Sequence, residues 1–171
     1  MAAKDSGAAP LDSPAAMARD NETIRVLAKN RRATFEFHVL DRLECGLALR
    51  GTEVKSLRAG QCSIAEAFGL VKGGELYLIG ATIPEYSHGN IHNHKPTRER
   101  KLLLHRRELA TWDKRVREKG ITIVPLTLYF KGHRVKIEMA LVKGKKLYDR
   151  REDVKRRTAQ RDIDRALSRR R

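Results

Sequence analysis

Closely spaced histidines and a cysteine are the residues of this chain whose types could do chemistry. His88, His92 and His94 lie in one polar loop, but no Cys or carboxylate stands near them at the spacing of a zinc site. Cys45 and His38 could pair as a nucleophile and its base, although no elbow motif such as G-x-S-x-G accompanies them. The acids are scattered, and no pair is placed for acid–base chemistry. We therefore expect no catalytic residue, no metal site and no cofactor, and we predict that the protein is not an enzyme.

Clusters of basic residues indicate a different chemistry, the binding of a polyanion. The 171 residues carry a formal net charge of +16, and residues 143–171 supply half of it, with 13 Lys or Arg against five acids. A surface of mixed charge would not show this bias of sign. We therefore predict a nucleic-acid partner, in particular RNA. The clusters are Lys29-x-Arg31-Arg32, Arg98-x-Arg100-Lys101, Arg106-Arg107, Lys143-x-Lys145-Lys146, Arg150-Arg151 and Lys155-Arg156-Arg157.

Other features of the composition narrow the kind of RNA contact and the cellular setting. Aromatic residues make up only 5% of the chain, which argues against a base-stacking platform and favours contacts to phosphates, sugars and RNA shape. No apolar run approaches the roughly 20 residues that span a bilayer, and the N-terminus lacks the apolar region of a secretory signal. Two cysteines, Cys45 and Cys62, are too few for a disulfide framework. We expect a cytoplasmic protein with no membrane partner.

The hydrophobic pattern predicts a small β domain that has to position the basic residues. Residues 1–29, rich in Ala, Pro, Ser and Asp, are expected to form a flexible leader, and residues 30–142 the RNA-binding domain. Helices are expected at residues 51–60 and 105–119. The expected strands are residues 34–39, 46–49, 64–71, 75–81, 121–130 and 134–142, with a Lys72-Gly73-Gly74 hairpin turn between the third and the fourth.

Six short strands joined mostly by short turns close most economically into a small barrel. We therefore predict a mainly β fold, a small antiparallel closed barrel of the oligonucleotide-binding (OB) type with flanking helices. Arg134, Lys136 and Glu138 alternate with apolar residues, which fits a barrel wall that is wet on one side.

Residues 143–171 contain too few apolar residues to bury themselves, and we predict that they form a disordered basic tail. Glu152 with Arg156 and Asp153 with Arg157 are helical pairs that contribute about 0.2–0.5 kcal/mol each, and an isolated helix of this length is marginal in water. Two interpretations stay open, permanent disorder or a tail that is coil when free and helical when anchored on RNA. We favour the second.

Four motifs, in this order, resemble the SsrA-binding protein family, which is also called small protein B or SmpB. The resemblance covers residues 30 to the C-terminus, and the leader has no part in it. The block G-T-E-V-K-S-L-R-A-G is the most specific part. The motifs lie at residues 30–33, 44–60, 96–108 and 143–151.

The resemblance implies an RNA-binding adaptor. Proteins of this family bind the tRNA-like part of transfer-messenger RNA (tmRNA) and take it to ribosomes stalled on messages without a usable stop codon, the process called trans-translation. Their OB-type barrel clasps the RNA, and their tail reaches the decoding region and the empty message channel of the small ribosomal subunit. We expect the same here, for a protein that is a monomer when free. The alternative is a structural ribosomal protein or another basic RNA-binding protein.

The resemblance also implies roles for single residues. Glu44 matches an acidic position that supports RNA binding, where a carboxylate can accept hydrogen bonds from base amino groups or 2′-hydroxyls. Leu103 and His105 match RNA-facing positions, although core packing is the simpler interpretation of Leu103. The RNA-binding candidates are Arg31, Arg32, Glu44, Lys101, Leu103 and His105. The ribosome-engaging candidates are Lys143, Lys145, Lys146, Tyr148, Asp149, Arg150, Arg151, Lys155, Arg156 and Arg157, in which Asp149-Arg150-Arg151 stands for the D-K-R signature of the family.

Overall fold

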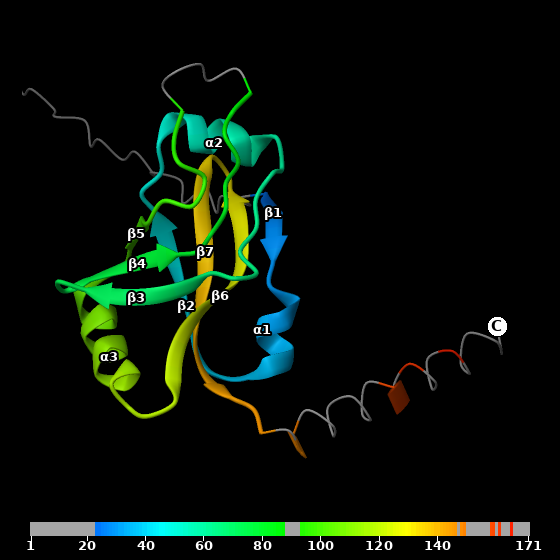
Figure 1. Ribbon diagram of the computed structural model, residues 1–171, viewed down its shortest axis with the longest axis vertical. Helices are drawn as coiled ribbons and strands as arrows, with labels where there is room; N and C mark the ends of the chain where they lie inside the picture. The colour runs from blue at the N-terminus through cyan, green and yellow to red at the C-terminus, as the bar shows by residue number, and fades with distance from the viewer. Residues whose placement is uncertain are drawn as a thin grey trace, which may run out of the picture.

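Seven strands and three helices make up the part of the chain that the computed structural model describes (Figure 1). The described residues are 23–87, 93–146, 148, 149, 158, 159, 161 and 165. In chain order the elements are β1 (Ile24–Lys29), α1 (Arg31–Glu36), β2 (Phe37–Leu47), α2 (Gly51–Arg58), β3 (Phe68–Lys72), β4 (Glu75–Ile79), β5 (Arg100–Leu103), α3 (Arg106–Val116), β6 (Ile121–Lys131) and β7 (Arg134–Gly144).

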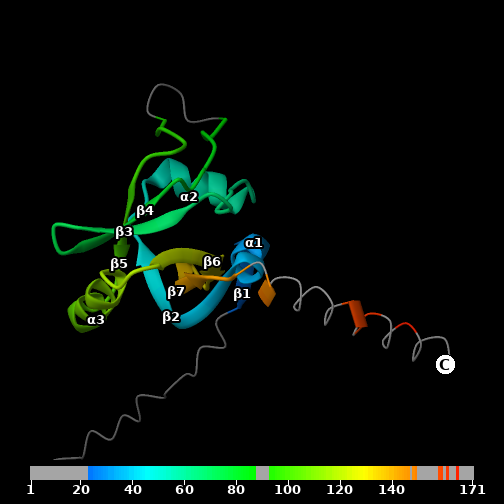
Figure 2. The same ribbon diagram turned by 60° about the horizontal axis from the view of Figure 1, so that its bottom comes forward.

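All seven strands belong to one antiparallel sheet, in the order β1-β6-β3-β4-β5-β2-β7. Because β7 also pairs with β6 along most of its length, the pairings return to β6 after passing through the other strands. The link between β3 and β6 is narrow, with Gly69 and Ile123 as its one residue pair. Figure 2 shows the β3–β4 hairpin on one side of the core, with β2, β6 and β7 on the other. A mainly β antiparallel fold with flanking helices is thus confirmed.

The main hydrophobic core lies inside this sheet. Ile137, Met139 and Leu141 of β7 are fully buried in it, and Leu57 of α2 and Trp112 of α3 are buried in the same cluster. This confirms the apolar face that the alternation along β7 predicts. The opposite face of β7 is wet only in its first half, because Ala140 and Val142 pack with Ala33, Val124 and Leu126 in a second, smaller cluster.

The secondary structure that rests on local signals agrees with the prediction. Both α2 and α3 lie inside their predicted ranges, and β6 and β7 match the last two predicted strands. The turn between β3 and β4 places Gly73 at φ 61° and Gly74 at φ 72°, the left-handed backbone that a tight hairpin turn requires. No helix among the described residues is long and apolar enough to cross a membrane.

The first strand corrects the predicted leader. Residues 24–29 form β1, which pairs with β6 and places Val26 opposite Tyr129. The strand is six residues long, and its alternation is too short to be recognised without the partner strand. The ordered sheet therefore begins at Ile24.

The next segment also differs from the prediction. Residues 34–36 are helical, because Asn30 Oδ1 accepts the backbone N–H of Ala33 at 3.0 Å and so caps α1. The two strands predicted at residues 34–39 and 46–49 are one continuous strand, β2, whose alternation is interrupted by a register shift between Val39 and Asp41. The strand β5 was not predicted either, because its consecutive leucines show no alternation of apolar and polar residues.

Candidate RNA-binding surface

Glu44 lies on the outer face of β2, within a cluster of polar residues from β6 and β7. The hydroxyl of Tyr129 donates a hydrogen bond to Glu44 Oε2. The other carboxylate oxygen, Oε1, lies 3.4 Å from Lys136 Nζ and 3.6 Å from Lys131 Nζ. The Glu44 side chain is still 39% exposed, so a ligand can reach it.

Electrostatics keep this carboxyl ionised. The hydrogen bond from Tyr129 holds the pKa of Glu44 below its ordinary value. Partial burial alone would raise this pKa, but the positive charges of Lys131 and Lys136 also lower it. Burial, and then the hydrogen bond to Glu44, raise the pKa of Tyr129, so its hydroxyl stays protonated and donates. The site therefore presents a negative acceptor surrounded by cations.

A row of residues crosses four strands next to Glu44. Leu103 of β5 pairs with Gly46 of β2, Gly46 pairs with Lys136 of β7, and Lys136 pairs with Tyr129 of β6. Directly paired residues of neighbouring strands share a face of the sheet, and Glu44 is two residues from Gly46 on the same face. The sheet thus brings Glu44 and Leu103, which are 59 positions apart in sequence, onto one surface.

The side chain of Leu103 points away from the core. It is 52% exposed, whereas its neighbour Leu102 is buried. Gly46 lets Leu103 lie close against β2, since a Cβ atom at position 46 would stand 3.3 Å from Leu103 Cβ. The structure thus overrides the simpler interpretation of Leu103 as a core residue.

Arg31 and Arg32 lie on α1 and face different neighbours. Arg31 lines a cavity of about 500 Å³ together with Arg42 and Glu138, which extends the outer face beyond Glu44. Arg42 Nη1 donates to Glu138 Oε1 at 3.2 Å, beside the Glu44 position in the register. Arg32 instead forms ion pairs with Glu36 at 2.7 Å and with Glu66 at 3.3 Å.

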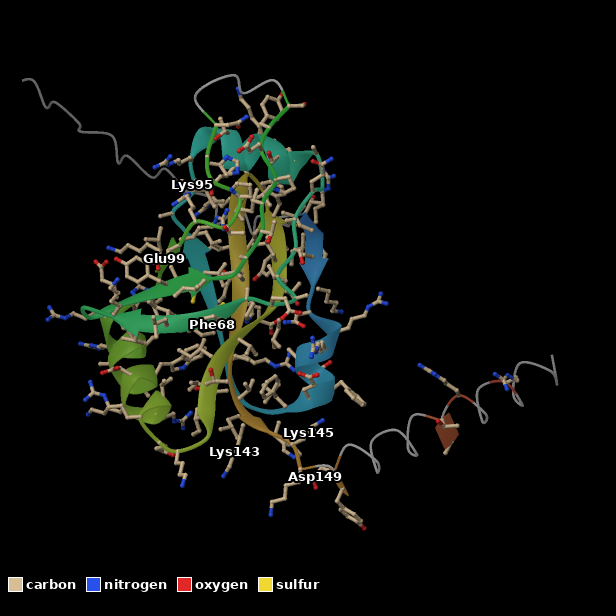
Figure 3. The ribbon with its side chains drawn as sticks, in the orientation of Figure 1. Phe68, Lys95, Glu99, Lys143, Lys145 and Asp149 are labelled. Atoms are coloured by element: carbon tan, nitrogen blue, oxygen red, sulfur yellow. The ribbon has the colours of Figure 1, made fainter. Side chains whose placement is uncertain are left out.

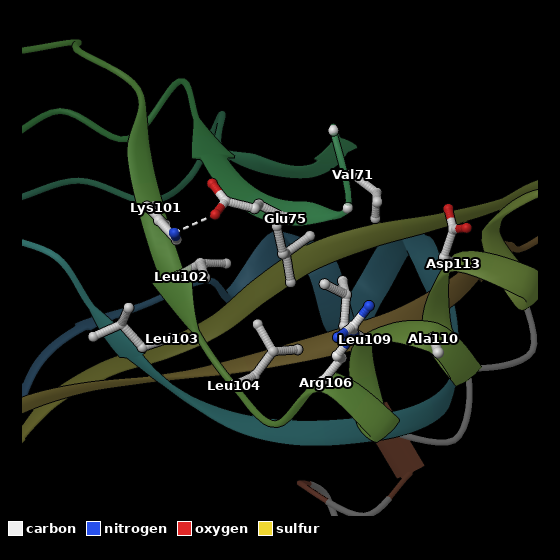
Figure 4. Close-up of a pocket in the computed structure, with 13 residues that line it drawn as sticks. Val71, Glu75, Lys101, Leu102, Leu103, Leu104, Arg106, Leu109, Ala110 and Asp113 are labelled. Atoms are coloured by element: carbon white, nitrogen blue, oxygen red, sulfur yellow. Dashed lines mark hydrogen bonds and ion pairs between the residues drawn. The ribbon is translucent and has the colours of Figure 1, made fainter.

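Lys101 borders a groove of about 610 Å³ between the β3–β4 hairpin, β5 and α3 (Figure 4). Its ammonium group forms an ion pair with Glu75, and this contact lowers the pKa of the Glu75 carboxyl. Arg106 and Asp113 also line the groove, so its two cations are matched by two acids.

His105 lies between β5 and α3, directly before the first turn of α3. Its backbone N–H donates to Glu108 Oε2 at 3.0 Å, which helps to begin the helix, and its side chain is exposed.

The basic cluster Arg98-x-Arg100 serves the core instead of the surface. Arg100 Nε donates to Glu53 Oε1 at 2.9 Å, Arg98 Nε donates to the same oxygen at 2.8 Å, and the side chains of Glu53 and Arg100 are fully buried. Burial alone would raise the pKa of Glu53, but hydrogen bonds from Arg98 and the Arg50 backbone, with the charge of Arg100, outweigh burial and lower it. These two arginines are therefore structural.

The described tail residues begin where β7 leaves the domain, and Figure 3 shows Lys143, Lys145 and Asp149 there. Lys143 and Lys146 are exposed, Tyr148 is 69% exposed, and Lys145 is half-buried. Tyr148, Asp149, Thr158, Ala159, Arg161 and Arg165 are helical. The other candidates, Arg150, Arg151, Lys155, Arg156 and Arg157, lie outside the described residues, as does the predicted change from coil to helix.

The residues considered for other chemistry are engaged elsewhere. His94 Nε2 donates to the Ile83 carbonyl at 3.0 Å, and its Nδ1 forms a hydrogen bond with the Thr52 hydroxyl at 3.0 Å. Both nitrogens are occupied, and His88 and His92 lie outside the described residues. Cys45 is buried, and burial raises the pKa of its thiol to about 12, which makes it a poor nucleophile.

Comparison with known proteins decides the family. The sequence profile of the family described as SmpB protein matches residues 27–169. The chain belongs to the SmpB family. An SsrA-binding protein of Pelotomaculum thermopropionicum is 52% identical to it over 147 residues, which cover 86% of this chain and 96% of that protein. An SsrA-binding protein of Mycobacterium sp. (strain KMS) is 50% identical over 170 residues, 99% of this chain and 97% of that protein.

A solved structure also resembles this SmpB-family chain. It is described as "tmRNA-SmpB: a journey to the center of the bacterial ribosome", and the matching chain is 44% identical with a TM-score of 0.60. The match covers 70% of this chain and 85% of that one. The family profile begins at residue 27, so most of the predicted leader lies outside it, although the Mycobacterium relative aligns through almost the whole chain.

Sequence reasoning missed part of the surface on this SmpB-family chain. The sequence does not predict RNA contacts for Tyr129, Lys131 or Arg42, and it indicates Lys136 only as part of the solvent-exposed side of a barrel wall. The signal that could have found them is their alternation with apolar residues along β2, β6 and β7. The alternation alone would not have shown which of them stand next to Glu44, because that depends on strand register.

Proposed function

We propose that this chain is an RNA-binding adaptor that binds tmRNA and delivers it to stalled ribosomes for trans-translation, and that it is not an enzyme. Membership of the SmpB family is the observation that carries this proposal. The likeness to the SmpB chain of a solved tmRNA–ribosome structure supports it. The net charge of +16 provides the long-range attraction that a polyanionic partner requires.

The proposal assigns RNA affinity to the domain that begins at Ile24 and ends near Val142. The return of the strand pairings to β6 supports a closed barrel of the OB type, a fold whose sheet face commonly binds oligonucleotides. Lys131 and Lys136 would contact phosphates, and Leu103 would pack against riboses or bases. Arg31, Arg32, Lys101 and His105 would extend the contact area around this centre.

Glu44 has a distinct role in this proposal. A carboxylate that is already ionised can accept hydrogen bonds from a base amino group or a 2′-hydroxyl, which Lys and Arg cannot do. The two lysines beside Glu44 offset its repulsion of phosphates. The cluster thereby adds selectivity to an interface whose affinity comes mainly from cations.

The proposal assigns placement on the ribosome to residues 143–171, which would enter the decoding region and the message channel of the small subunit. The described tail residues from Tyr148 onwards are already helical, and the rest of the tail would become helical there, where phosphates offset its charge and the cost of ordering it. The free protein would be a monomer in the cytoplasm, where ribosomes work.

The test is binding of the full-length protein to tmRNA and to an elongator tRNA at several salt concentrations. We expect a preference for tmRNA and a log–log salt slope of roughly −0.7 to −0.9 per phosphate neutralised. Glu44→Gln should weaken tmRNA binding about tenfold, since hydrogen bonds to charged groups contribute roughly 1.5–3 kcal/mol. Glu118→Gln, at an exposed acid after α3, is the matched control. A flat salt response, or equal affinity for both RNAs, would refute the proposal.

A further inference from the structure

The start of the tail is held against α1 by its own backbone. β7 ends at Gly144, which pairs with Phe37 at the start of β2. The next backbone N–H, that of Lys145, donates to the Glu36 carbonyl at 2.9 Å, and Lys145 Nζ donates to the Thr34 carbonyl at 3.2 Å. Lys145, a candidate for ribosome contact, is therefore engaged with the domain.

Asp149 continues this attachment. Its Oδ2 accepts the backbone N–H of Lys146 at 3.1 Å, three residues earlier, which is the contact that begins a helix in a capping box. The same oxygen lies 3.3 Å from Nε2 of His38 on β2. Tyr148 and Asp149 are helical, so this carboxylate joins the first turn of the tail helix to the sheet.

The charge of Asp149 agrees with an intramolecular role. It is one of five acids among 13 basic residues in the tail, and an acid aimed at ribosomal phosphates would be repelled. Its side chain is only 38% exposed, and the hydrogen bond from His38 holds the pKa of Asp149 below its ordinary value. Among the described residues, Lys146 also acts on Asp149, and Lys143 lies opposite His38 in the pairing of β2 with β7.

We propose that His38 and Asp149 are positioning residues, which fix the first turn of the tail against β2 and so set the direction in which the tail leaves the domain. The consequence for tagging rests on the proposed function. The contact itself does not, so the two can be tested separately.

The contact is tested in the free, full-length protein by following the carboxyl carbon of Asp149 by NMR during a pH titration. His38→Ala should move the midpoint of Asp149 upward, towards that of an ordinary aspartate, and His38→Arg should restore a low midpoint because it keeps a donor. His133→Ala, at an exposed histidine in the β6–β7 turn, is the control and should leave the midpoint unchanged. An Asp149 midpoint that does not respond to His38→Ala would overturn the proposal.

The consequence is tested by peptide tagging on stalled ribosomes, with tmRNA affinity measured alongside. His38→Ala and Asp149→Asn should each lower the tagging rate about two- to fivefold, the range of an exposed ion pair, without changing tmRNA affinity. The double variant should be no worse than either single variant, and His38→Arg should restore tagging. Asp113→Asn, which removes the surface ion pair between Asp113 on α3 and Arg117 directly after it, is the matched control.

Two outcomes would count against the positioning role. Loss of tagging in Asp149→Asn but not in His38→Ala would mean that Asp149 contacts the ribosome directly. Equal tagging by all variants would mean that the direction set by this contact does not affect tagging on the ribosome. If instead the wild-type chain neither bound tmRNA nor supported tagging, the proposed function would fail while the NMR result stood.

Discussion

The hydroxyl of Tyr129 on β6 donates a hydrogen bond to the carboxylate of Glu44 on β2, across the intervening strand β7. Through this contact one phenol orients the acid that stands among the cations of the outer face. It also keeps the acid ionised, because the bond is the largest cause of its lowered pKa. The geometry of the proposed RNA contact therefore depends on a residue that need not touch RNA.

Replacing Tyr129 by Phe removes this hydrogen bond and leaves the ring. We expect the pKa of Glu44 to rise towards its ordinary value, so that tmRNA affinity falls at a higher pH during acidification than in the wild type. At neutral pH the loss should be about three- to tenfold, because Glu44 loses its fixed orientation. Binding curves from neutral pH to well below 4.5, the ordinary pKa of a Glu, measure both effects. In a Glu44→Gln background the same substitution should have little further effect, and full additivity would contradict this account.

Gly46→Val should displace Leu103 from its place over β2. A Cβ atom there already stands 3.3 Å from Leu103 Cβ, and the two further methyl groups must lie between Leu103 and Lys136. We expect weaker tmRNA binding with the fold retained, as measured by affinity and by circular dichroism. Gly51→Val, where a Cβ atom meets nothing within 4 Å, is the control. Unchanged affinity in Gly46→Val would show that the row beside Glu44 does not contact RNA.

Glu53→Gln should destabilise the domain by about 3–5 kcal/mol, because it leaves the buried guanidinium of Arg100 without its counter-ion. The folded-state pKa of Glu53 is lowered, so its stabilising contribution is present above the unfolded value of 4.5 and is lost as the pH falls through the folded value. Urea unfolding at several pH values measures both effects, and the variant should lose less stability on acidification than the wild type. Glu75→Gln, which breaks the exposed ion pair with Lys101, should change stability far less, because solvent screens exposed ion pairs.

Gly69→Ala tests the narrow junction between β3 and β6. A Cβ atom at position 69 would lie 2.6 Å from Ile123 Cγ2, so the two strands would have to separate. We expect a loss of about 1–3 kcal/mol, the range of overpacked cores, together with faster amide exchange in β3. Gly51→Ala, in open space at the start of α2, should not destabilise the protein. Equal stability of the two variants would contradict the close approach of β3 to β6.

Removal of the residues after Tyr148 separates the two proposed activities. The outer face of β2, β5, β6 and β7 is intact in this truncated protein, so tmRNA affinity should stay within about twofold of the wild type at physiological salt, where distant charges are screened. Peptide tagging on stalled ribosomes should be abolished, because the proposed ribosome-engaging segment is gone. Gel-shift titration and a tagging assay on the same preparations compare the two. A parallel loss of both activities would contradict the division of labour.

Local signals were sufficient for a large part of this fold. The two Gly residues of the β3–β4 turn, the periodicity of α3 and the alternation along β6 and β7 act over a few residues, so they can be recognised without the partner strands. The same kind of signal failed at α1, where the cap from Asn30 overrides the alternation of residues 34–39. It also failed at β5, because Leu102, Leu103 and Leu104 are the same residue type and show no alternation, although Leu103 alone is strongly exposed.

The sequence by itself determined that this chain is basic, mainly β and a member of the SmpB family, and it singled out Glu44 and Leu103 as candidates. The tertiary structure alone decided which residues surround them. Tyr129 is 85 positions from Glu44, to which it donates a hydrogen bond. Arg100 is 47 positions from Glu53, with which it forms a buried ion pair, so Arg100 is not a surface cation. The physical reason is strand register, because pairing between distant segments decides which side chains meet and which face they share.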